Sequence, residues 1–366
     1  LTKIARPMTD REYLIALAAF VPFGPARLKL LVDYFTSAKK VWSTARRDLE
    51  EVGLSKKLIE GFVKHRDEFD FKNYFASLEK MDISVFTQKD KSYPKSLLEI
   101  PSSPVVLYIK GDIKKIENAV AIVGSRKMTS YGKEVTEIFS RELAQLGLVI
   151  VSGLARGIDT AAHKAALSVK GRTVAVLGCG LDSVYPPENT NLAKIIVENG
   201  GALISEYPLK YPALPINFAA RNRIVSGLSR AIVVVEGRRK SGTLLTASAA
   251  ADQGKTVFAV PGEITSPMSE ASYFLIQNGA KMATSTKDIL DELHIDFRVD
   301  KESLAKVMPT TKEEKKIVKA LEKEPLHLDE VVRMSNLEAG NVMATLTGME
   351  MKGIVKNLGQ GRYKLI

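Results

Sequence analysis

Residues 119–159 decide the fold of this chain and read AVAIVGSRKMTSYGKEVTEIFSRELAQLGLVIVSGLARGID. Two short apolar runs, 119–123 and 148–151, each lead into a glycine-containing turn, and the residues between them are spaced like the apolar face of a helix. Unbroken apolar runs are typical of strands buried on both faces of a parallel sheet. The stretch therefore predicts a strand–helix–strand unit with both turns at the carboxyl edge of the sheet, where α/β proteins bind ligands.

The same alternation of apolar runs and helical patterns extends from residue 111 to about residue 293. Repeated strand–helix units predict the α/β class, with an extended Rossmann-like, doubly wound parallel sheet. The expected strands are 119–123, 148–151, 173–177, 202–204, 231–235 and 256–260, and the expected helices lie near 131–146, 158–167, 189–198, 217–227, 243–252 and 271–278. We place the sheet domain at residues 111–298.

Two regions precede the sheet domain. Residues 1–75 predict a small helical domain, in which residues 21–25 (VPFGP) partly match a helix-hairpin-helix turn. Phe23 is large for that motif, so a plain turn between two helices fits the sequence better. Residues 76–110 contain short extended pieces and several prolines, which predict a connector that lays an edge strand or flap against the sheet.

A linker and a third domain follow the sheet domain. Residues 299–309 are polar and end in Pro309, as expected of a linker. Residues 310–366 predict three helices and then two short strands around a glycine-rich turn, which is the pattern of a winged helix. Winged helices bind duplex DNA in some proteins and dock other proteins elsewhere, so both remain candidate roles for this domain.

The composition narrows the class of protein. The 366 residues include one cysteine, which has no partner for an internal disulfide, and four histidines without metal-ligand spacing. No apolar run approaches membrane-spanning length and no leader pattern occurs, so we expect a cytoplasmic protein without a metal or a membrane contact. The net charge is +11, and basic residues exceed acidic ones in each predicted region. A polyanionic partner and a merely solvated basic surface both fit this charge.

Small residues and cations gather at the predicted strand ends. Glycine allows close approach of a ligand, and backbone N–H groups at a helix start attract phosphate. Such turns along one edge of a sheet suit a string of phosphates better than a single nucleotide. They contain Gly124, Ser125 and Arg126, then Gly153 and Gly157, then Gly178 and Gly180, and finally Lys240, Ser241, Gly242 and Thr243.

An aromatic ring accompanies these cations. Phe218 precedes Arg221, Asn222 and Arg223 at the start of an expected helix. A ring that stacks on a base beside cations that meet the backbone is the combination that single-stranded nucleic acid requires. Burial of Phe218 in the core is the alternative. His163 stands alone on a half-buried helix and is better explained as a structural residue than as a catalytic one.

The order of the motifs resembles that of the DNA-processing protein A family (DprA/Smf). The matching segments cover about residues 111–293 and are IVGSR, VSGLARGIDTAAHKAAL, GCGLDSVYPPEN, ISEYP, FAARNRIVSGLS, SGTLLTASAAADQGK and VFAVPG. The resemblance implies a protein that binds single-stranded DNA, protects incoming strands and helps to load the RecA recombinase on them in natural transformation. It also implies a homodimer that has neither a cofactor nor a catalytic residue.

The resemblance assigns residues as well. The DNA-binding positions that it implies are Gly124, Ser125, Arg126, Gly153, Gly157, Phe218, Arg221, Asn222, Arg223, Lys240, Ser241, Gly242 and Thr243, and the dimer contact would contain Tyr273, Leu275, Ile276 and Met282. In two places the chain departs from the family. Pro187 and Pro215 stand where some members have a DNA-contacting lysine, so Arg238, Arg239 or Lys210 would have to supply that charge.

Enzymes on a related fold provide the alternative function. The sheet resembles that of the cytokinin-activating phosphoribohydrolases, which cleave nucleoside monophosphates with a glutamate that closely follows a Gly-Gly-x-Gly-Thr turn. Here Leu244 and Leu245 follow Thr243, so that carboxylate is missing, and Glu236 before the turn is the remaining candidate. The P-loop pattern and the dinucleotide-binding GxGxxG pattern are both incomplete. We therefore expect a binding protein rather than an enzyme.

Overall fold

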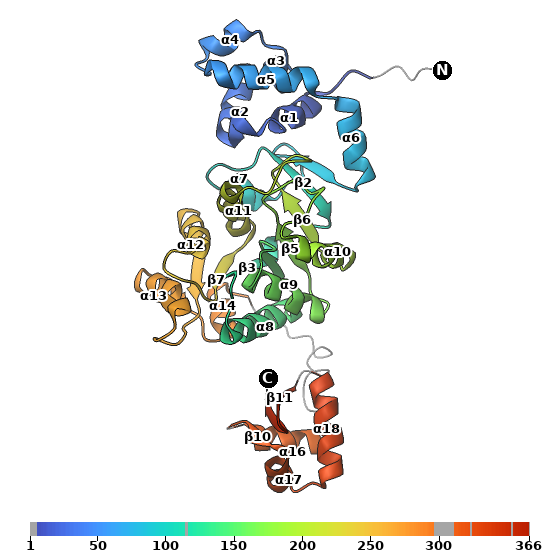
Figure 1. Ribbon diagram of the computed structural model, residues 1–366, viewed down its shortest axis with the longest axis vertical. Coiled ribbons are helices and arrows are strands. Elements are labelled where there is room, and N and C mark those ends of the chain that lie inside the picture. The colour runs from blue at the N-terminus through green and yellow to red at the C-terminus, as the bar shows by residue number, and fades with distance from the viewer. Residues whose placement is uncertain (1–5, 114–115, 296–310, 323, 353, 366) are drawn as a thin grey trace, which may run out of the picture. The chain divides into compact units, whose positions relative to one another are not determined.

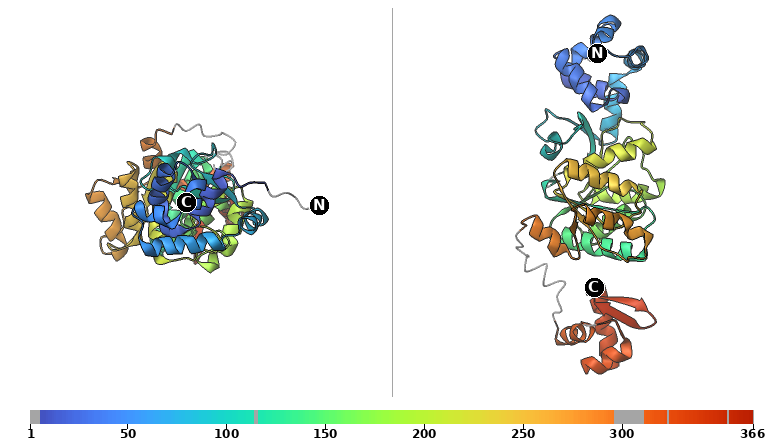
Figure 2. Two further views of the ribbon diagram at one scale, coloured as in Figure 1. Left: turned by 90° about the horizontal axis from the view of Figure 1, so that it is seen from above. Right: turned by 90° about the vertical axis from the view of Figure 1, so that its left-hand side faces the viewer.

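The computed structural model describes residues 6–113, 116–295, 311–322, 324–352 and 354–365 (Figure 1). The chain divides into two compact units, Leu1–Ile295 and Asp296–Ile366. Two further views show the helices of the first unit on both sides of its sheet (Figure 2). The predicted linker 299–309 lies outside the described residues.

A nine-stranded sheet is the centre of the first unit, in the order β1-β2-β6-β5-β4-β3-β7-β8-β9. The strands from β6 to β9 in this order are parallel, while β1 and β2 add antiparallel pairs at one edge. The strands are β1 (Ser84–Thr87), β2 (Val106–Gly111), β3 (Ala119–Val123), β4 (Val149–Ser152), β5 (Thr173–Val176), β6 (Ala202–Ser205), β7 (Ala231–Val234), β8 (Thr256–Ala259) and β9 (Lys281–Met282). The predicted doubly wound sheet is thus confirmed.

Helices cover both faces of the sheet, and the central strands are therefore buried on both sides. Every residue of β3 is buried, as its continuous apolar sequence predicts. On one face pack α8 (Ser130–Gln145), α9 (Ile158–Ser168) and α14 (Thr286–Glu292). On the other face pack α7 (Lys95–Leu98), α11 (Pro215–Leu228) and α12 (Gly242–Asp252). The remaining helices of this region are η2 (Ile116–Asn118), η3 (Pro187–Asn189), α10 (Thr190–Glu198), η4 (Pro267–Ser269) and α13 (Glu270–Gln277).

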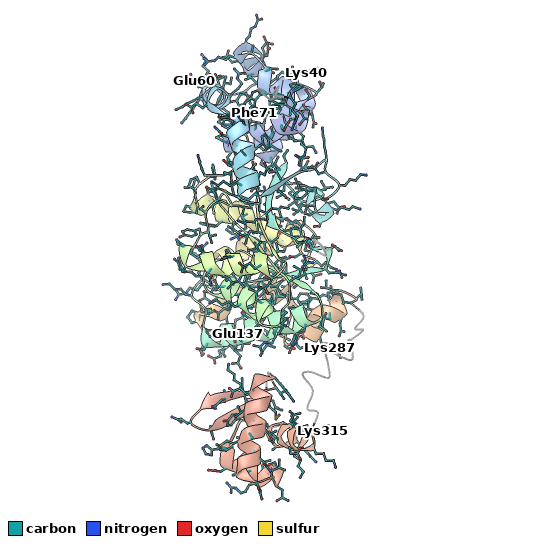
Figure 3. The ribbon with its side chains drawn as sticks, turned by 90° about the vertical axis from the view of Figure 1, so that its right-hand side faces the viewer. Lys40, Glu60, Phe71, Glu137, Lys287 and Lys315 are labelled. Atoms are coloured by element: carbon teal, nitrogen blue, oxygen red, sulfur yellow. The ribbon has the colours of Figure 1, made fainter. Side chains whose placement is uncertain are left out.

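The N-terminal helices share a core with the sheet edge. Their aromatic residues form a cluster around Trp42 and Phe62, and this cluster is continuous with apolar residues of β2, β6 and α10. The hydroxyl of Tyr74 donates to that of Tyr108 on β2 at 2.8 Å. Charged side chains such as Lys40 and Glu60 lie on the outside of this region (Figure 3). The helices are α1 (Asp10–Ala18), η1 (Val21–Phe23), α2 (Gly24–Tyr34), α3 (Ala38–Ser43), α4 (Arg46–Glu51), α5 (Lys56–Glu68) and α6 (Phe71–Lys80).

The second unit has the winged-helix architecture that the sequence predicts. A three-stranded sheet, ordered β10-β12-β11, packs with three helices around the buried Ile317, Val331 and Leu346. The helix α18 contains no lysine or arginine between its bounds, so it has no cation of its own for a DNA phosphate. The elements are α16 (Lys312–Leu321), β10 (Leu326–His327), α17 (Leu328–Ser335), α18 (Ala339–Met351), β11 (Val355–Gly359) and β12 (Arg362–Leu365).

Within the described residues, no single helix is long and apolar enough to cross a membrane. One pair of helices, Asp10–Ala18 and Val21–Tyr34, passes that test of length and composition together, but the pair is bent by 81°. Leu14 and Leu17 of this pair are buried in the core of the first unit. Burial in that core accounts for their apolar character.

Glu236, the candidate substitute for the missing catalytic carboxylate, holds the residue that caps a helix. It is 4% exposed, and it accepts hydrogen bonds from the backbone N–H of Thr129 at 2.8 Å and from the Thr129 hydroxyl at 2.6 Å. Thr129 in turn caps the start of α8. A side chain at Gly132 would collide with the carboxyl group, since its Cβ would lie 2.4 Å from Cδ of Glu236. The carboxylate therefore anchors α8 to the end of β7.

We predict that Glu236→Ala lowers the free energy of unfolding by about 1–3 kcal/mol, because the N–H and hydroxyl of the half-buried Thr129 lose their acceptor. Urea denaturation followed by circular dichroism measures this loss. Glu263→Ala removes an exposed glutamate and serves as the matched control. Equal stability of the two variants would contradict the structural role of Glu236.

Candidate functional site

The loops that follow β3, β4 and β7 meet the start of α11 around one cavity of about 720 Å³. Parallel strands bring these loops to the same edge of the sheet, as the sequence predicts. The predicted residues that line the cavity are Gly124, Ser125, Arg126, Gly153, Phe218, Arg221, Asn222, Lys240, Ser241, Gly242 and Thr243. Gly157 and Arg223 are the predicted residues that do not line it.

The glycines allow the loops to lie very close together. Gly157 has a φ of +75°, and a Cβ there would lie 2.2 Å from the carbonyl oxygen of Ser125. The next residue, Ile158, donates its N–H to that carbonyl at 3.1 Å. A Cβ at Gly124 would lie 2.6 Å from Cγ1 of Ile158. Gly157 thus allows the loops after β3 and β4 to pack directly against each other, although it does not itself line the cavity.

Arg221 is buried beneath the loops. Its side chain is 4% exposed and donates to the carbonyl oxygen of Val176 at the end of β5. A Cβ at Gly153 would lie 2.1 Å from its Nη1. The nearby Asp159 accepts the N–H groups of Gly153 at 3.0 Å and of Ala155 at 3.3 Å. The guanidinium therefore supports the cavity floor and contributes positive charge from a buried position.

Burial and electrostatic attraction have opposite effects on the pKa values of Asp159 and Arg221. Burial raises the pKa of Asp159, and the Arg221 guanidinium acts in the opposite direction. Burial likewise lowers the pKa of Arg221, while Asp159 counteracts the change. Each charge thus reduces the desolvation penalty of the other.

Arg223 points away from the cavity. It forms an ion pair with Glu206 at 2.5 Å on the opposite side of α11, where it lines a second cavity. Residues two positions apart on a helix do not share a face, so Arg221 and Arg223 cannot both point to the same site. The sequence showed that both arginines lie on one helix but gave no indication of which faces the cavity.

Arg126 and Phe218 form the exposed part of the site. The guanidinium carbon of Arg126 lies 5.5 Å from the centroid of the Phe218 ring, and Arg126 is exposed while Phe218 is half-buried. The ring of Tyr185 lies 5.2 Å from that of Phe218. Tyr185 was missed in the sequence analysis, although an aromatic residue soon after Gly178 and Gly180, in the loop after β5, was an available signal. Two rings and a cation thus lie side by side at the rim.

The cavity is strongly positive. The charged residues that line it are five cations and one acid, namely Arg126, Lys127, Arg221, Arg238, Lys240 and Asp159. The start of α12 adjoins Lys240 and has no side-chain cap, so the helix dipole adds to this positive charge. The Ser241 hydroxyl at this helix start has no hydrogen-bond partner among the described residues. The arrangement favours an extended anion.

Two of the residues predicted to replace the missing lysines, Arg239 and Lys210, do not line the cavity. Of the three candidates, Arg238 lines the cavity, as Pro215 does. Arg239 lies over the ring of Phe274, with its guanidinium carbon 3.6 Å from the centroid, and Lys210 is not among the lining residues. Lys127, which was not predicted from the sequence, is a further lining cation.

The catalytic alternatives find no support in the site. Glu236 does not line the cavity. His163 is fully buried, with Nδ1 2.6 Å from the hydroxyl oxygen of Thr173, and burial lowers its pKa to about 3. It is therefore a neutral structural residue at physiological pH. No group of three or more potential metal ligands occurs in the part of the chain that the structure describes.

The predicted dimer residues lie at the β9 edge of the sheet. Met282 on β9 is 54% exposed, while Tyr273, Leu275 and Ile276 on α13 are half-buried. The Tyr273 hydroxyl donates to the carbonyl of Gly262, and Leu275 packs against the sheet core. Met282 is thus the most exposed of the four.

Comparison with known proteins agrees with this architecture. Residues 84–294 match the sequence model of a family described as DNA recombination-mediator protein A, and residues 302–361 match a DprA winged helix domain. Protein Smf of Synechocystis is 33% identical over 97% of this chain and 99% of its own length. DNA processing protein DprA of Bacillus subtilis is 39% identical over 69% of this chain and 84% of its own length.

Two solved structures are similar as well. DNA processing protein A of Streptococcus pneumoniae gives a TM-score of 0.66 at 34% identity, covering 80% of this chain and all of that chain. DNA processing protein A of Helicobacter pylori, described in terms of its single-stranded DNA binding mode, gives 0.54 at 31% identity and covers 60% of this chain and 98% of that chain. The resemblance drawn from the sequence motifs is thereby confirmed.

Proposed function

This chain belongs to the DNA recombination-mediator protein A family (DprA/Smf), and on that premise we propose that it binds single-stranded DNA along the cavity at the carboxyl edge of its sheet. The proposed role is to protect incoming strands during transformation and to help load the RecA recombinase on them. The observation that carries the proposal is the exposed Arg126 beside the Phe218 ring, at the rim of a cavity with five cations and one acid.

The geometry fits a flexible single strand. Cations and an uncapped helix start offer contacts for successive phosphates, and the rings of Phe218 and Tyr185 offer faces for unstacked bases. These contacts do not depend on base identity, so we expect little sequence preference. The Helicobacter pylori relative, which is described as binding single-stranded DNA, supports the same assignment.

The first test concerns Arg126. We expect Arg126→Ala to weaken binding of every single-stranded sequence alike and to make the salt dependence shallower by about one unit at most, because one phosphate contact is lost. Fluorescence anisotropy across a salt series measures both. Arg46→Ala, which removes an exposed arginine from α4, is the control of equal charge. The proposal fails if a folded Arg126→Ala protein binds like this control.

The second test separates stacking from packing at Phe218. Loss of a stacking platform in Phe218→Ala should cost roughly 1–3 kcal/mol of binding free energy. Because the side chain is half-buried, we expect a smaller loss of folding stability. Binding and thermal unfolding should be measured on the same preparation. Intact binding with a large drop in Tm would show that Phe218 is a core residue.

We also propose that the protein acts without turnover. The helix-capping role of Glu236 and the absence of a carboxylate after Thr243 support this. Incubation with nucleoside monophosphates should release no free base above a protein-free blank, as chromatography would show. Base release that is lost in a folded Glu236→Gln protein would establish the phosphoribohydrolase alternative.

Self-association through the β9 edge completes the proposal. A two-fold dimer would bring two binding cavities into one particle, so one strand could engage both with a gain from effective concentration. Exposed Met282 supports this surface. Light scattering should show a dimer for the wild type at about 10–50 µM and a monomer for Met282→Arg with Tyr273→Ala. A monomeric wild type would overturn the dimer, and a dimeric double variant would overturn this surface.

A further inference from the structure

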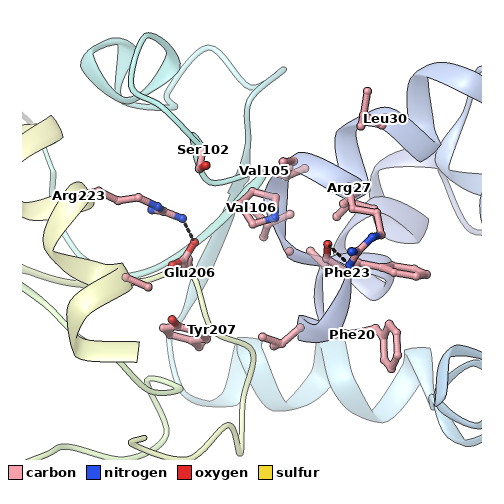
Figure 4. A pocket seen from close by; sticks show the side chains of 17 residues that line it. Phe20, Phe23, Arg27, Leu30, Ser102, Val105, Val106, Glu206, Tyr207 and Arg223 are labelled. Carbon is pink, nitrogen blue, oxygen red and sulfur yellow. Dashed lines mark hydrogen bonds and ion pairs between the residues drawn. The ribbon is translucent and has the colours of Figure 1, made fainter. Parts of the chain in front are cut away.

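A second cavity, of about 620 Å³, lies behind α11 on the side away from the candidate DNA site (Figure 4). The turn at 21–25 and the first residues of α2 line one side of it. Val105, Val106, Tyr207 and Arg223 line the other side. The turn that partly matches a helix-hairpin-helix motif thus borders a cavity within the first unit.

The walls of this cavity are mainly apolar. Phe23 and Val106 are each 2% exposed and belong to the core cluster shared by the N-terminal helices and the sheet edge. Leu30 at the rim is 69% exposed. An apolar cavity of this volume with a few convergent polar groups has the character of a small-molecule site.

The polar groups in the cavity give it a preference for negative charge. The charged lining residues are Arg27, Glu206 and Arg223, two cations and one acid. Glu206 is already paired with Arg223. Nη1 of Arg223 is buried without a hydrogen-bond partner among the described residues. A buried donor without an acceptor is costly, so a rotation of the partly exposed guanidinium that brings this donor to a ligand's acceptor would stabilise the complex.

The start of α2 reinforces this preference. No side chain caps the helix, and Gly24, Pro25 and Ala26 line the cavity. The positive end of the helix dipole therefore adjoins the cavity. The Arg27 guanidinium is held at the same end by the carbonyls of Pro22 at 3.0 Å and Phe23 at 3.4 Å.

We propose that this cavity binds a small organic anion, with an aromatic or aliphatic body against the apolar walls and a carboxylate, sulfonate or phosphate group that accepts from Arg223. The proposal does not depend on DNA binding. The two sites share α11, since Ala220 and Arg223 line this cavity while Phe218 and Asn222 line the other. A ligand here would therefore contact the back of the helix that presents Phe218 to DNA.

The test uses two probes that differ in charge. 8-Anilinonaphthalene-1-sulfonate carries an aromatic body and a sulfonate, and N-phenyl-1-naphthylamine carries the same body without it. We expect the folded full-length protein to bind the sulfonate probe at one site, with affinity at least about tenfold weaker in Ala220→Trp, which fills the cavity from an exposed position. Ser248→Trp, on an exposed face of α12, is the matched control and should bind like the wild type.

A second variant tests charge recognition. Glu206→Leu with Arg223→Leu removes the ion pair but keeps an apolar cavity, so it should retain the uncharged probe while binding of the sulfonate probe weakens about tenfold. Circular dichroism melting confirms that each variant is folded. Equal sulfonate binding by Ala220→Trp and its control would overturn the site. Equal effects on both probes in the double variant would overturn the assignment of an anion.

Discussion

The contact between Gly153 and the guanidinium of Arg221 determines how closely the loops of the candidate site can approach one another. A side chain at position 153 would force the guanidinium to move, because an added Cβ would lie 2.1 Å from Nη1 of Arg221. The guanidinium in turn donates to the end of β5, and Asp159 holds the backbone of the loop after β4. Arg221 thus joins α11 to the end of β5, Asp159 holds the loop after β4, and the cavity above them takes its shape from these contacts.

The positively charged residues of the site are of two kinds, one buried and the others exposed. Arg221 is enclosed by protein, where a charge is screened less by water and salt. Arg126, Lys127 and Lys240 are exposed and free to follow a ligand. The buried charge contributes a constant positive potential, while the exposed side chains supply contacts that depend on salt. The helix α11 links these roles, because it contributes both Arg221 and Phe218 to the cavity.

The sequence predicted the strand–helix units and the common edge of their glycine turns because these depend on local apolar patterns. The direction in which the side chains of α11 point was harder to predict, since a sequence does not give the rotation of a helix about its axis. Arg221 and Arg223 therefore looked equivalent, yet one is buried under the site and the other pairs with Glu206 behind the helix. The structural role of Glu236 could not be predicted from the sequence either. Its partner Thr129 is distant in sequence, and the two residues come into contact only because β3 pairs with β7.

Both borders of the nine-stranded sheet are poorly suited to adding another strand. At one border β9 consists of two residues, Lys281 and Met282, which offer too little unpaired backbone for a stable new ladder. At the other border Arg11 donates to the carbonyl of Val85 on β1, which occupies an acceptor that an incoming strand would need. Short or covered edges oppose the edge-to-edge growth that leads to aggregates. The sheet of this protein therefore has little tendency to form fibres through its edges, even where many copies are crowded together.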